Sequence, residues 1–420
     1  MSKPERSVTI LTEYFHPEEA STAQLLTQLS TGLTDAFDMS VLTGYPNYHE
    51  SDRDTSVPKR ESHEGVDIER VQATRFDKDR TLGRVANWLT FTVLVCFRLL
   101  RSRGSDDTLV VLSNPPILPL AAWISKRIRG TSYVYLIYDV YPDMAVKLGY
   151  LSEDSIIVRL WERFNRAIYR DADRIVVLGN SMENQVVRKM GSDSDFDPGK
   201  IEVVHNWEDE SFIEPIAKEK NSFARDQGTV EPFTVVYSGN IGRFHELKTV
   251  IDAIDRLDAQ GYDVKFLIIG EGARKSELQE YVSRNDIDAV DFLPFQPLDR
   301  LPKSLTCGDA SLVGIKEGMK GLCVSSKLYS SLAAGRPVLA VVGQGDEVEV
   351  VVRECDCGIH VEPGDITGCV EAIKQWIDEP QLRDQQGQNA RQCLEERFSF
   401  AESRDRYKRV LEEVTKAMQV

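Results

Sequence analysis

Short continuous apolar runs alternate with segments of helical spacing along the first half of the chain. Continuous runs are typical of parallel strands that are covered on both faces, whereas apolar residues three and four positions apart are typical of helices packed on a sheet. The continuous runs predict strands at 8–11, 39–42, 109–112, 133–138, 174–178 and 201–204. The spaced segments predict helices at 22–33, 118–128 and 157–169.

The alternation stops in a polar segment, 211–232, and then begins again. The second half predicts strands at 234–237, 265–269, 290–293, 310–314 and 337–342, with late helices at 367–377 and 380–397. Alternating strands and helices predict parallel sheets with helices on both faces, hence two doubly wound, Rossmann-like α/β domains. Such sheets bind ligands beyond the carboxyl ends of their strands, so we expect the domains to face each other across a cleft.

These patterns also predict the domain boundaries. We expect a first domain at 1–212, a linker at 213–232 and a second domain at 233–397. The last segment, 398–420, is expected to form a helix that packs back on the first domain.

Composition narrows the class of protein. With 41% hydrophobic and 28% charged residues, the chain of 420 residues is globular rather than disordered. Its formal net charge of −16 argues against nucleic acid as a partner, since phosphate backbones favour basic surfaces. The seven scattered cysteines predict reduced, mostly buried thiols in a cytosolic protein. The polar start runs straight into the first strand and predicts no secretory signal.

The most apolar stretch is 85–100, although no run in the chain reaches the roughly 18 apolar residues of a membrane span. An apolar segment with arginines at its ends is typical of one that lies in a membrane surface. A buried core helix that happens to end in arginines explains the same pattern, and the sequence leaves both readings open. The aromatic and flanking basic residues are Trp88, Phe91, Phe97, Arg84, Arg98, Arg101 and Arg103.

The segment 325–340 predicts a helix, a stop and a buried strand. Ser325 and Ser326 are expected to cap the helix, and Gly335 suits the left-handed residue that follows a helix end. Lys327 falls in the first turn. A helix start that carries a lysine and hydroxyls can bind a phosphate-bearing ligand, although an ordinary α/β unit has the same pattern.

A glycine-rich turn follows the first strand of the second half. Gly239 and Gly242 allow backbone N–H groups to approach an anion, and Arg243 can clamp a diphosphate, although a plain βα turn is the alternative. Glu271 follows the next strand at an equivalent place. Because its carboxylate repels phosphate, we expect it to hold a hydroxyl instead.

In the first half, Asp139 ends a buried strand. A carboxylate at this edge can orient a sugar hydroxyl or accept a proton, and it can equally cap the next helix. The chain contains no GxSxG, HExxH or P-loop motif, and no DxD suited to a metal-held nucleotide.

Several motifs together resemble the family-4 glycosyltransferases of the GT-B fold. In order along the chain, they read TEYFHPEEAST, SNPP, YDVYPD, YSGNIGRFHELKTVIDA, IIGEGARKSELQ, VDFLPFQP, SSKLYSSLAAGRPVLA and CGIHVEPGD. The branch looks like that of surface-polysaccharide enzymes, including fucosyl- and N-acetylfucosaminyl-transferase-like members. The resemblance covers nearly the whole chain.

The resemblance implies retaining transfer of a sugar from a nucleotide-diphosphate donor to an acceptor, often a lipid-linked glycan at the cytoplasmic membrane face. It implies that Arg243 and Lys327 neutralise the diphosphate without an essential metal, and that Asp139 lies on the acceptor side. The family places the nucleotide on the second domain. The residues that would contact the donor there are Gly239, Asn240, Gly242, Glu271, Leu293, Phe295, Ser326 and Ser330.

One departure from the family concerns donor recognition. Many members carry two glutamates eight residues apart, the second of them five residues before the helix-ending glycine. Counting back from Gly335 places Ser330 and Leu322 at these positions. Donor hydroxyls would then be held partly from elsewhere, and the candidates are Glu317, Ser326 and Glu271.

Two other functions remain open on the sequence alone. A nucleotide-sugar 2-epimerase shares the GT-B fold but needs acids that flank C2 of the sugar. A catalytically silent subunit that binds sugar nucleotides is the second alternative, because fold does not fix function.

Overall fold

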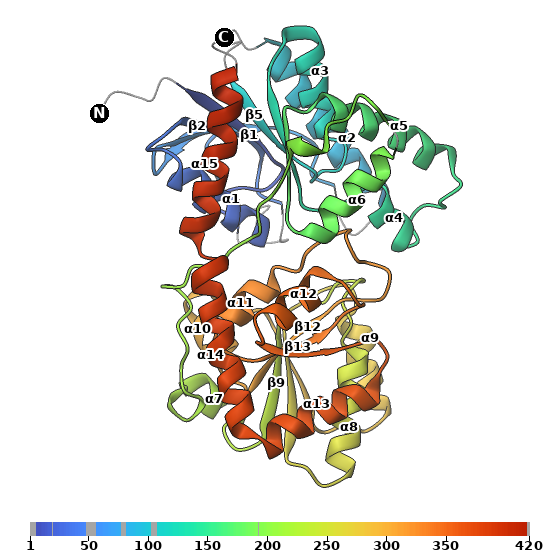
Figure 1. The fold of residues 1–420 in the computed structure, drawn as a ribbon, viewed down its shortest axis with the longest axis vertical. Coiled ribbons are helices and arrows are strands. Elements are labelled where there is room, and N and C mark those ends of the chain that lie inside the picture. Colours follow the sequence, from blue (N-terminus) through green and yellow to red (C-terminus); the bar gives the residue numbers. More distant parts are fainter. Residues whose placement is uncertain are drawn as a thin grey trace. The chain divides into compact units, whose positions relative to one another are not determined.

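The computed structural model describes residues 6–18, 20–47, 56–76, 81–101, 107–191 and 193–417. It divides into two compact units (Figure 1). The first contains Met1–His205 and Ser403–Val420, and the second contains Asn206–Glu402. Each unit is a twisted sheet with helices on its faces.

The first unit contains an eight-stranded sheet with the order β3-β4-β2-β1-β5-β6-β7-β8. Its strand pairs are parallel except for the antiparallel pair β3–β4. The strands are β1 (Ser7–Leu11), β2 (Asp38–Gly44), β3 (Arg60–His63), β4 (Val66–Val71), β5 (Thr108–Leu112), β6 (Tyr133–Ile137), β7 (Arg174–Val177) and β8 (Ile201–Val203).

The strands and helices expected in this half are present, and β3, β4 and two helices were not expected. The sequence of β3, RESH, has no buried residue, and β4 alternates buried residues with charged ones, so neither forms a continuous apolar run. The helices are α1 (Ser21–Gly32), α2 (Thr81–Arg101), α3 (Pro119–Arg129), α4 (Asp143–Lys147), α5 (Ile156–Asp171) and α6 (Asn180–Met190).

The second unit contains a six-stranded sheet, parallel throughout, with the order β11-β10-β9-β12-β13-β14. Its central strands β9, β12 and β13 are buried, apart from Ser238 at the end of β9, because helices cover both faces, as their continuous apolar sequences predict. The strands are β9 (Phe233–Ser238), β10 (Val264–Ile269), β11 (Val290–Leu293), β12 (Ala310–Gly314), β13 (Val338–Val341) and β14 (Gly358–Val361).

The helices of the second unit include the two expected late ones, α13 and α14. The helices are α7 (Ser222–Asp226), α8 (Lys248–Ala259), α9 (Lys275–Arg284), α10 (Leu301–Leu305), α11 (Lys327–Ala333), α12 (Glu347–Glu354), α13 (Ile366–Asp378) and α14 (Pro380–Arg397). The last strand, β14, was not expected, because only Val361 of its four residues is buried.

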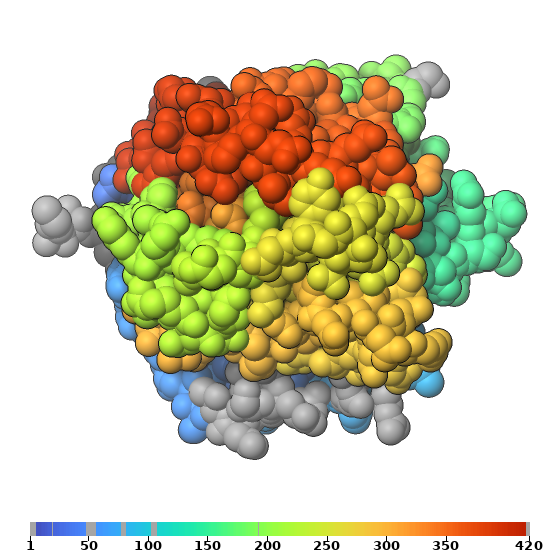
Figure 2. All heavy atoms as spheres, turned by 90° about the horizontal axis from the view of Figure 1, so that it is seen from below, coloured from blue at the N-terminus to red at the C-terminus, as the bar shows by residue number. Residues whose placement is uncertain are grey.

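The segment expected to be a linker, 213–232, belongs to the second unit. Lys218 forms an ion pair of 2.5 Å with Asp309, and the Asn221 side chain caps α7. Figure 2 shows this yellow-green segment against the red C-terminal helices of the same unit. There Arg391 of α14 donates hydrogen bonds to backbone carbonyls of Glu210 and Ile213. The polar segment 213–232 therefore packs on the surface of the second unit and does not form a separate linker.

The last helix, α15 (Phe400–Ala417), contacts the first unit from Ser403 onward. Glu413 pairs with Arg174 of β7 at 2.9 Å, and the Ser403 hydroxyl donates to the His205 carbonyl at 3.2 Å. The first unit is therefore completed by the end of the chain.

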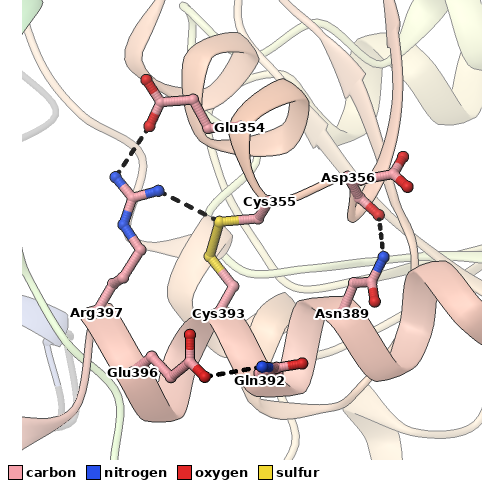
Figure 3. Close-up of a disulfide and its surroundings, with 8 residues drawn as sticks. All are labelled: Glu354, Cys355, Asp356, Asn389, Gln392, Cys393, Glu396 and Arg397. Atoms are coloured by element: carbon pink, nitrogen blue, oxygen red, sulfur yellow. Dashed lines mark hydrogen bonds and ion pairs between the residues drawn. A yellow bond between two sulfur atoms is a disulfide. The ribbon is translucent and has the colours of Figure 1, made fainter.

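A disulfide joins Cys355, which follows α12, to Cys393 of α14 (Figure 3). The expectation that all seven cysteines are reduced is therefore wrong for this pair. Arg397 lies beside the bridge and pairs with Glu354 at 3.0 Å. The Cα atoms are 6.0 Å apart although the residues are separated by 38 positions, so sequence spacing gave no signal of the pairing.

We expect reduction of this disulfide to destabilise the second unit. Opening a loop of 38 residues raises the entropy of the unfolded chain and should lower the free energy of unfolding by about 2–4 kcal/mol. Urea unfolding of the wild type with and without dithiothreitol measures the effect, and Cys393→Ala should be insensitive to the reductant. A count of seven free thiols in the native protein before reduction would show that the bridge is absent.

Candidate functional site

Two loops meet at the carboxyl edge of the second sheet. They follow the neighbouring parallel strands β9 and β10. The N–H of Gly239 donates to the carbonyl of Ile269 at 2.9 Å, and the N–H of Ile241 donates to the carbonyl of Glu271 at 2.7 Å. The two predicted turns therefore form one backbone platform at the edge where α/β sheets bind ligands.

Glycines permit this close approach. Gly270 has φ of +143°, and a Cβ atom there would lie 2.0 Å from the carbonyl oxygen of Gly239. Gly272 has φ of +151°, and a Cβ atom there would lie 2.5 Å from the carbonyl oxygen of Ile241. Any other residue at either position would push the loops apart.

Lys327, the first residue of α11, lies against this platform. A Cβ atom at Gly239 would lie only 2.6 Å from Cε of Lys327, so the glycine makes room for the lysine stem. The Lys327 Nζ lies 3.2 Å from Nε2 of His245 and 5.3 Å from the centre of the Tyr237 ring. The helix thus brings the amine of Lys327 to the glycine turn.

Burial sets the protonation of this group. Burial lowers the pKa of Lys327 to about 8. Burial, together with the positive charges of Lys327 and Arg274, holds the pKa of His245 well below its usual value. An amine with a lowered pKa gains most from an incoming anion, because the anion restores the charge that desolvation disfavours.

A second group of predicted residues lies beside Gly270. The Leu293 carbonyl accepts hydrogen bonds from the N–H of Gly270 at 2.9 Å and from Nζ of Lys275 at 3.3 Å. Lys275 also pairs with the exposed Glu271 at 2.6 Å. The Phe295 ring is 41% exposed, and a Cβ atom at Gly270 would lie 3.4 Å from it.

The predicted caps of α11 are not formed. Ser326 has helical backbone angles and its side chain makes no capping hydrogen bond. Backbone carbonyls of Ser325 and Ser326 instead accept from the N–H groups of Leu328 and Tyr329, which removes the need for a side-chain cap. The helix has seven residues, so the cation of Lys327 is its main contribution to an anion site.

Two further predicted residues of this unit are Ser330 on α11 and Arg243 on the glycine-rich turn. The Ser330 hydroxyl donates to the Lys327 carbonyl at 3.2 Å, back along its own helix. Arg243 follows Gly242 on the same loop, and its side chain is exposed.

Asp139 lies in the first unit, where it follows β6. The Ser113 hydroxyl, at the end of the neighbouring β5, accepts hydrogen bonds from the N–H groups of Tyr138 at 2.9 Å and Asp139 at 3.1 Å. Burial raises the pKa of Asp139 to about 6. The carboxylate form still dominates at neutral pH and can accept a proton or hold a hydroxyl.

The segment 85–100 forms most of α2, and it is not a core helix. Only Asn87, Phe91, Thr92 and Val95 of α2 are buried. Its length and composition would allow it to cross a membrane, although a single such helix is weak evidence. A stripe of exposed apolar residues runs along it, which we call the α2 stripe: Leu82, Val85, Leu89, Val93, Leu94 and Phe97.

Two of the arginines near the end of α2 contact other side chains of the first unit. Arg98 forms two hydrogen bonds with Glu69 of β4, at 2.8 and 2.9 Å. Arg101 lies over the Phe97 ring at 3.9 Å, and Arg103 lies outside the described residues.

A second row of exposed apolar residues lies on α5. Helix α3 contacts both α2 and α5, so the two helices belong to the same part of the first unit. The row on α5 contains Ile156, Ile157, Leu160 and Phe164. A groove beside the same helix is lined by four arginines together with Glu153, Glu162 and Asp193. These arginines are Arg159, Arg163, Arg166 and Arg170.

The structure therefore brings most of the predicted donor residues together on one edge and leaves Asp139 in the other unit. It also adds His245 and Tyr237, which contact Lys327 and which the sequence did not single out. His245 is three residues beyond Gly242 in a turn already chosen for anion binding, and that position was the available signal.

Comparisons with known proteins agree with this architecture. Residues 219–393 match the family model "Glycosyl transferases group 1", and residues 22–207 match the "Glycosyl transferase 4-like domain". The chain is 29% identical to the probable glycosyltransferase WbjE of Pseudomonas aeruginosa, over 75% of this chain and 76% of WbjE. It is 24% identical to the putative colanic acid biosynthesis glycosyl transferase WcaI of Escherichia coli K12, over 71% and 73% of the two chains.

A solved structure shows the same fold. Anabaena HepE in complex with UDP-glucose superposes with a TM-score of 0.71 at 14% identity, covering 96% of this chain and 99% of HepE. Two α/β domains of this kind, each built on a largely parallel sheet, are those of the GT-B fold. The chain belongs to the family-4 glycosyltransferases of this fold, and it is an enzyme of the transferase class.

We expect Gly270→Ala to destabilise the second unit and to separate the two loops. The positive φ and the 2.0 Å approach to the Gly239 carbonyl should together cost roughly 3 kcal/mol. Gly343→Ala is the matched control, because a Cβ atom there would meet nothing within 4 Å. Equal urea midpoints for the two variants, followed by circular dichroism, would contradict the close approach.

Proposed function

We propose that this enzyme transfers a sugar, with retention at the anomeric carbon, from a nucleotide-diphosphate donor to a lipid-linked acceptor in the assembly of a surface glycan. The observation that carries the proposal is the position of Lys327 against Gly239, where two glycine loops meet. A buried lysine that can carry a positive charge, and backbone N–H groups that can approach closely, suit a diphosphate at the carboxyl edge of a sheet.

The chemistry follows from the charge that develops during transfer. The bond between the sugar C1 and the diphosphate oxygen breaks, and a new bond forms between C1 and the acceptor oxygen. The leaving diphosphate gains negative charge, and we assign the stabilisation of that charge to Lys327, which lies against the glycine turn, and to Arg243 on the same turn. We propose that these groups suffice without an essential metal ion. The acceptor hydroxyl loses its proton to a base, for which Asp139 is our candidate.

Donor contacts are assigned to the same platform. We place the nucleotide base against Phe295 and the Leu293 backbone, because an exposed ring can stack on a base. The hydroxyls of the donor are assigned to Glu271, Ser326 and Ser330. The complex of HepE with UDP-glucose supports a nucleotide sugar as the donor class. The name of WcaI supports a role in surface-polysaccharide biosynthesis.

We further propose that the enzyme works as a peripheral protein on the inner face of the cell membrane. The α2 stripe presents apolar side chains to solvent, and α5 adds a second apolar row. The arginines of α5 stand out in a chain with a net charge of −16. Anionic lipid headgroups complement such a basic, apolar surface, and an enzyme on it could reach a lipid-linked acceptor.

Incubation with labelled nucleotide sugars and a membrane extract tests the proposed function. We expect the label to move to lipid, and to do so in the presence of EDTA. Lys327→Met and Arg243→Ala should each lower kcat by about a hundredfold, or about 3 kcal/mol, because each removes a charge that faces the leaving group. Arg256→Ala, on the exposed side of α8, should leave kcat unchanged.

Other outcomes of this assay select the alternatives. Free epimerised sugar would identify a 2-epimerase, and binding without turnover would identify a silent sugar-nucleotide-binding subunit. Near-normal kcat in correctly folded Arg243→Ala would remove that residue from the site.

Membrane association has its own test. Because Arg98 is held by Glu69, charge reversal there would disturb the fold, so the α2 stripe is the better target. The triple variant Leu89→Gln, Val93→Gln, Phe97→Gln should lose at least tenfold in its affinity for vesicles that contain phosphatidylglycerol, measured by co-sedimentation. Leu298→Gln, an exposed apolar residue of the second unit, is the control. Sedimentation of the triple variant at the wild-type level would refute the membrane role.

A further inference from the structure

The amine of Lys327 lies against the ring of His245. Nζ and Nε2 are 3.2 Å apart, and the two residues are 82 positions apart in the chain. His245 is buried, and hydrogen bonds hold both its ring and its backbone. The N–H of Gly242 donates to Nδ1 at 2.9 Å, and the His245 carbonyl accepts from Arg274 at 3.0 Å.

The hydrogen bond to Gly242 fixes the tautomer of the ring. Because Nδ1 accepts from a backbone N–H, it carries no proton, and the proton of a neutral imidazole is then on Nε2. The Nε2–H group points toward the amine of Lys327 and can only donate. An ammonium group has three donors and no acceptor, whereas a neutral amine has a lone pair. The contact at 3.2 Å is therefore a hydrogen bond only if Lys327 is neutral.

The other groups around this pair are few among the described residues. Arg274 adds a positive charge near His245, although it also pairs with Glu277 at 3.0 Å. The Tyr237 ring, 5.3 Å from Nζ, favours the charged amine, as does the thiol of Cys323 when it ionises. Burial opposes both, and burial is the largest influence on Lys327.

We propose that His245 is a positioning residue that favours the neutral amine of Lys327 in the empty site, and that binding of a nucleotide diphosphate at alkaline pH brings one proton to Lys327. This inference rests on the proposed donor site. The proton comes from solvent and converts the amine to an ammonium group, which then pairs with a phosphate oxygen. The Nε2–H of His245 loses its acceptor in this step and becomes available to the ligand.

This arrangement has a consequence for the reaction. A neutral lysine can be buried without a counter-ion, whereas burial of an unpaired ammonium group costs free energy. The charge is then created next to the diphosphate that requires it. Donor affinity should consequently fall as the pH rises through the region where the free amine loses its proton, since protonation must then accompany binding.

Calorimetry in buffers of different ionisation enthalpy measures the proton uptake directly. The probes are UDP, GDP, CDP and dTDP, and the tightest of them is used between pH 7 and pH 9. The second pKa of a phosphate group is about 6, so above pH 8 the ligand itself takes up no proton. With the pKa of Lys327 at about 8, we expect little uptake at pH 7 and close to one proton per bound nucleotide at pH 9.

Variants separate this role from a structural one. His245→Gln replaces the Nε2–H donor by an amide oxygen that can accept from an ammonium group, so Lys327 should be charged before binding. Uptake at pH 9 should then fall at least threefold while the nucleotide still binds. Lys327→Met should abolish uptake and weaken binding at least tenfold. Lys374→Met, a surface lysine that contacts Gln260, should behave as the wild type.

The outcomes distinguish this inference from the proposed function. Binding of none of the four nucleotides, or unchanged affinity in Lys327→Met, would overturn the donor site and this inference with it. Binding that depends on Lys327 but takes up no proton at pH 9 would overturn the inference alone. Equal uptake in the wild type and in folded His245→Gln would show that His245 does not set the protonation of Lys327.

Discussion

The site depends on a backbone approach that only glycine allows. The carbonyl of Gly239 occupies the space in which Gly270 would carry a side chain, and Gly239 in turn leaves room for the stem of Lys327. The positions of the loops, the lysine and the exposed Phe295 ring all follow from these contacts. Strands β9 and β10 lie side by side in the sheet, so the glycines bring together two loops whose bases are already adjacent.

Removal from water then shifts the pKa values of the ionisable groups at these positions. The same packing that brings the loops together removes Lys327 from water and lowers its pKa. Asp139 shows the opposite shift for the same reason, because burial disfavours whichever form is charged. Both groups thereby titrate closer to neutral pH than they would on a surface. The departure at Ser330 fits this arrangement: its hydroxyl bonds within α11, so the helix contributes its lysine rather than an acid to the edge.

Much of the fold was predictable because buried parallel strands are continuous apolar runs. The central strands of both sheets and the helices that cover them follow from that pattern. β3 and β14 were missed because edge strands are half exposed and carry mixed sequences. Site residues could be predicted where they belong to a sequence motif, as Gly239 belongs to the glycine-rich turn. The contact of His245 with Lys327 and the pairing of Cys355 with Cys393 join distant segments, and local sequence does not encode such distances.

The two units differ in how the chain builds them. The second unit is one continuous stretch, Asn206–Glu402, whereas the first takes its last helix from the end of the chain. During synthesis, the ribosome therefore finishes the second unit before the first has all of its parts. Until α15 has been synthesised, the surface around Arg174 and His205 lacks the helix that contacts it in the folded protein. A premature stop near residue 400 would leave the second unit almost complete and the first unit without its last helix.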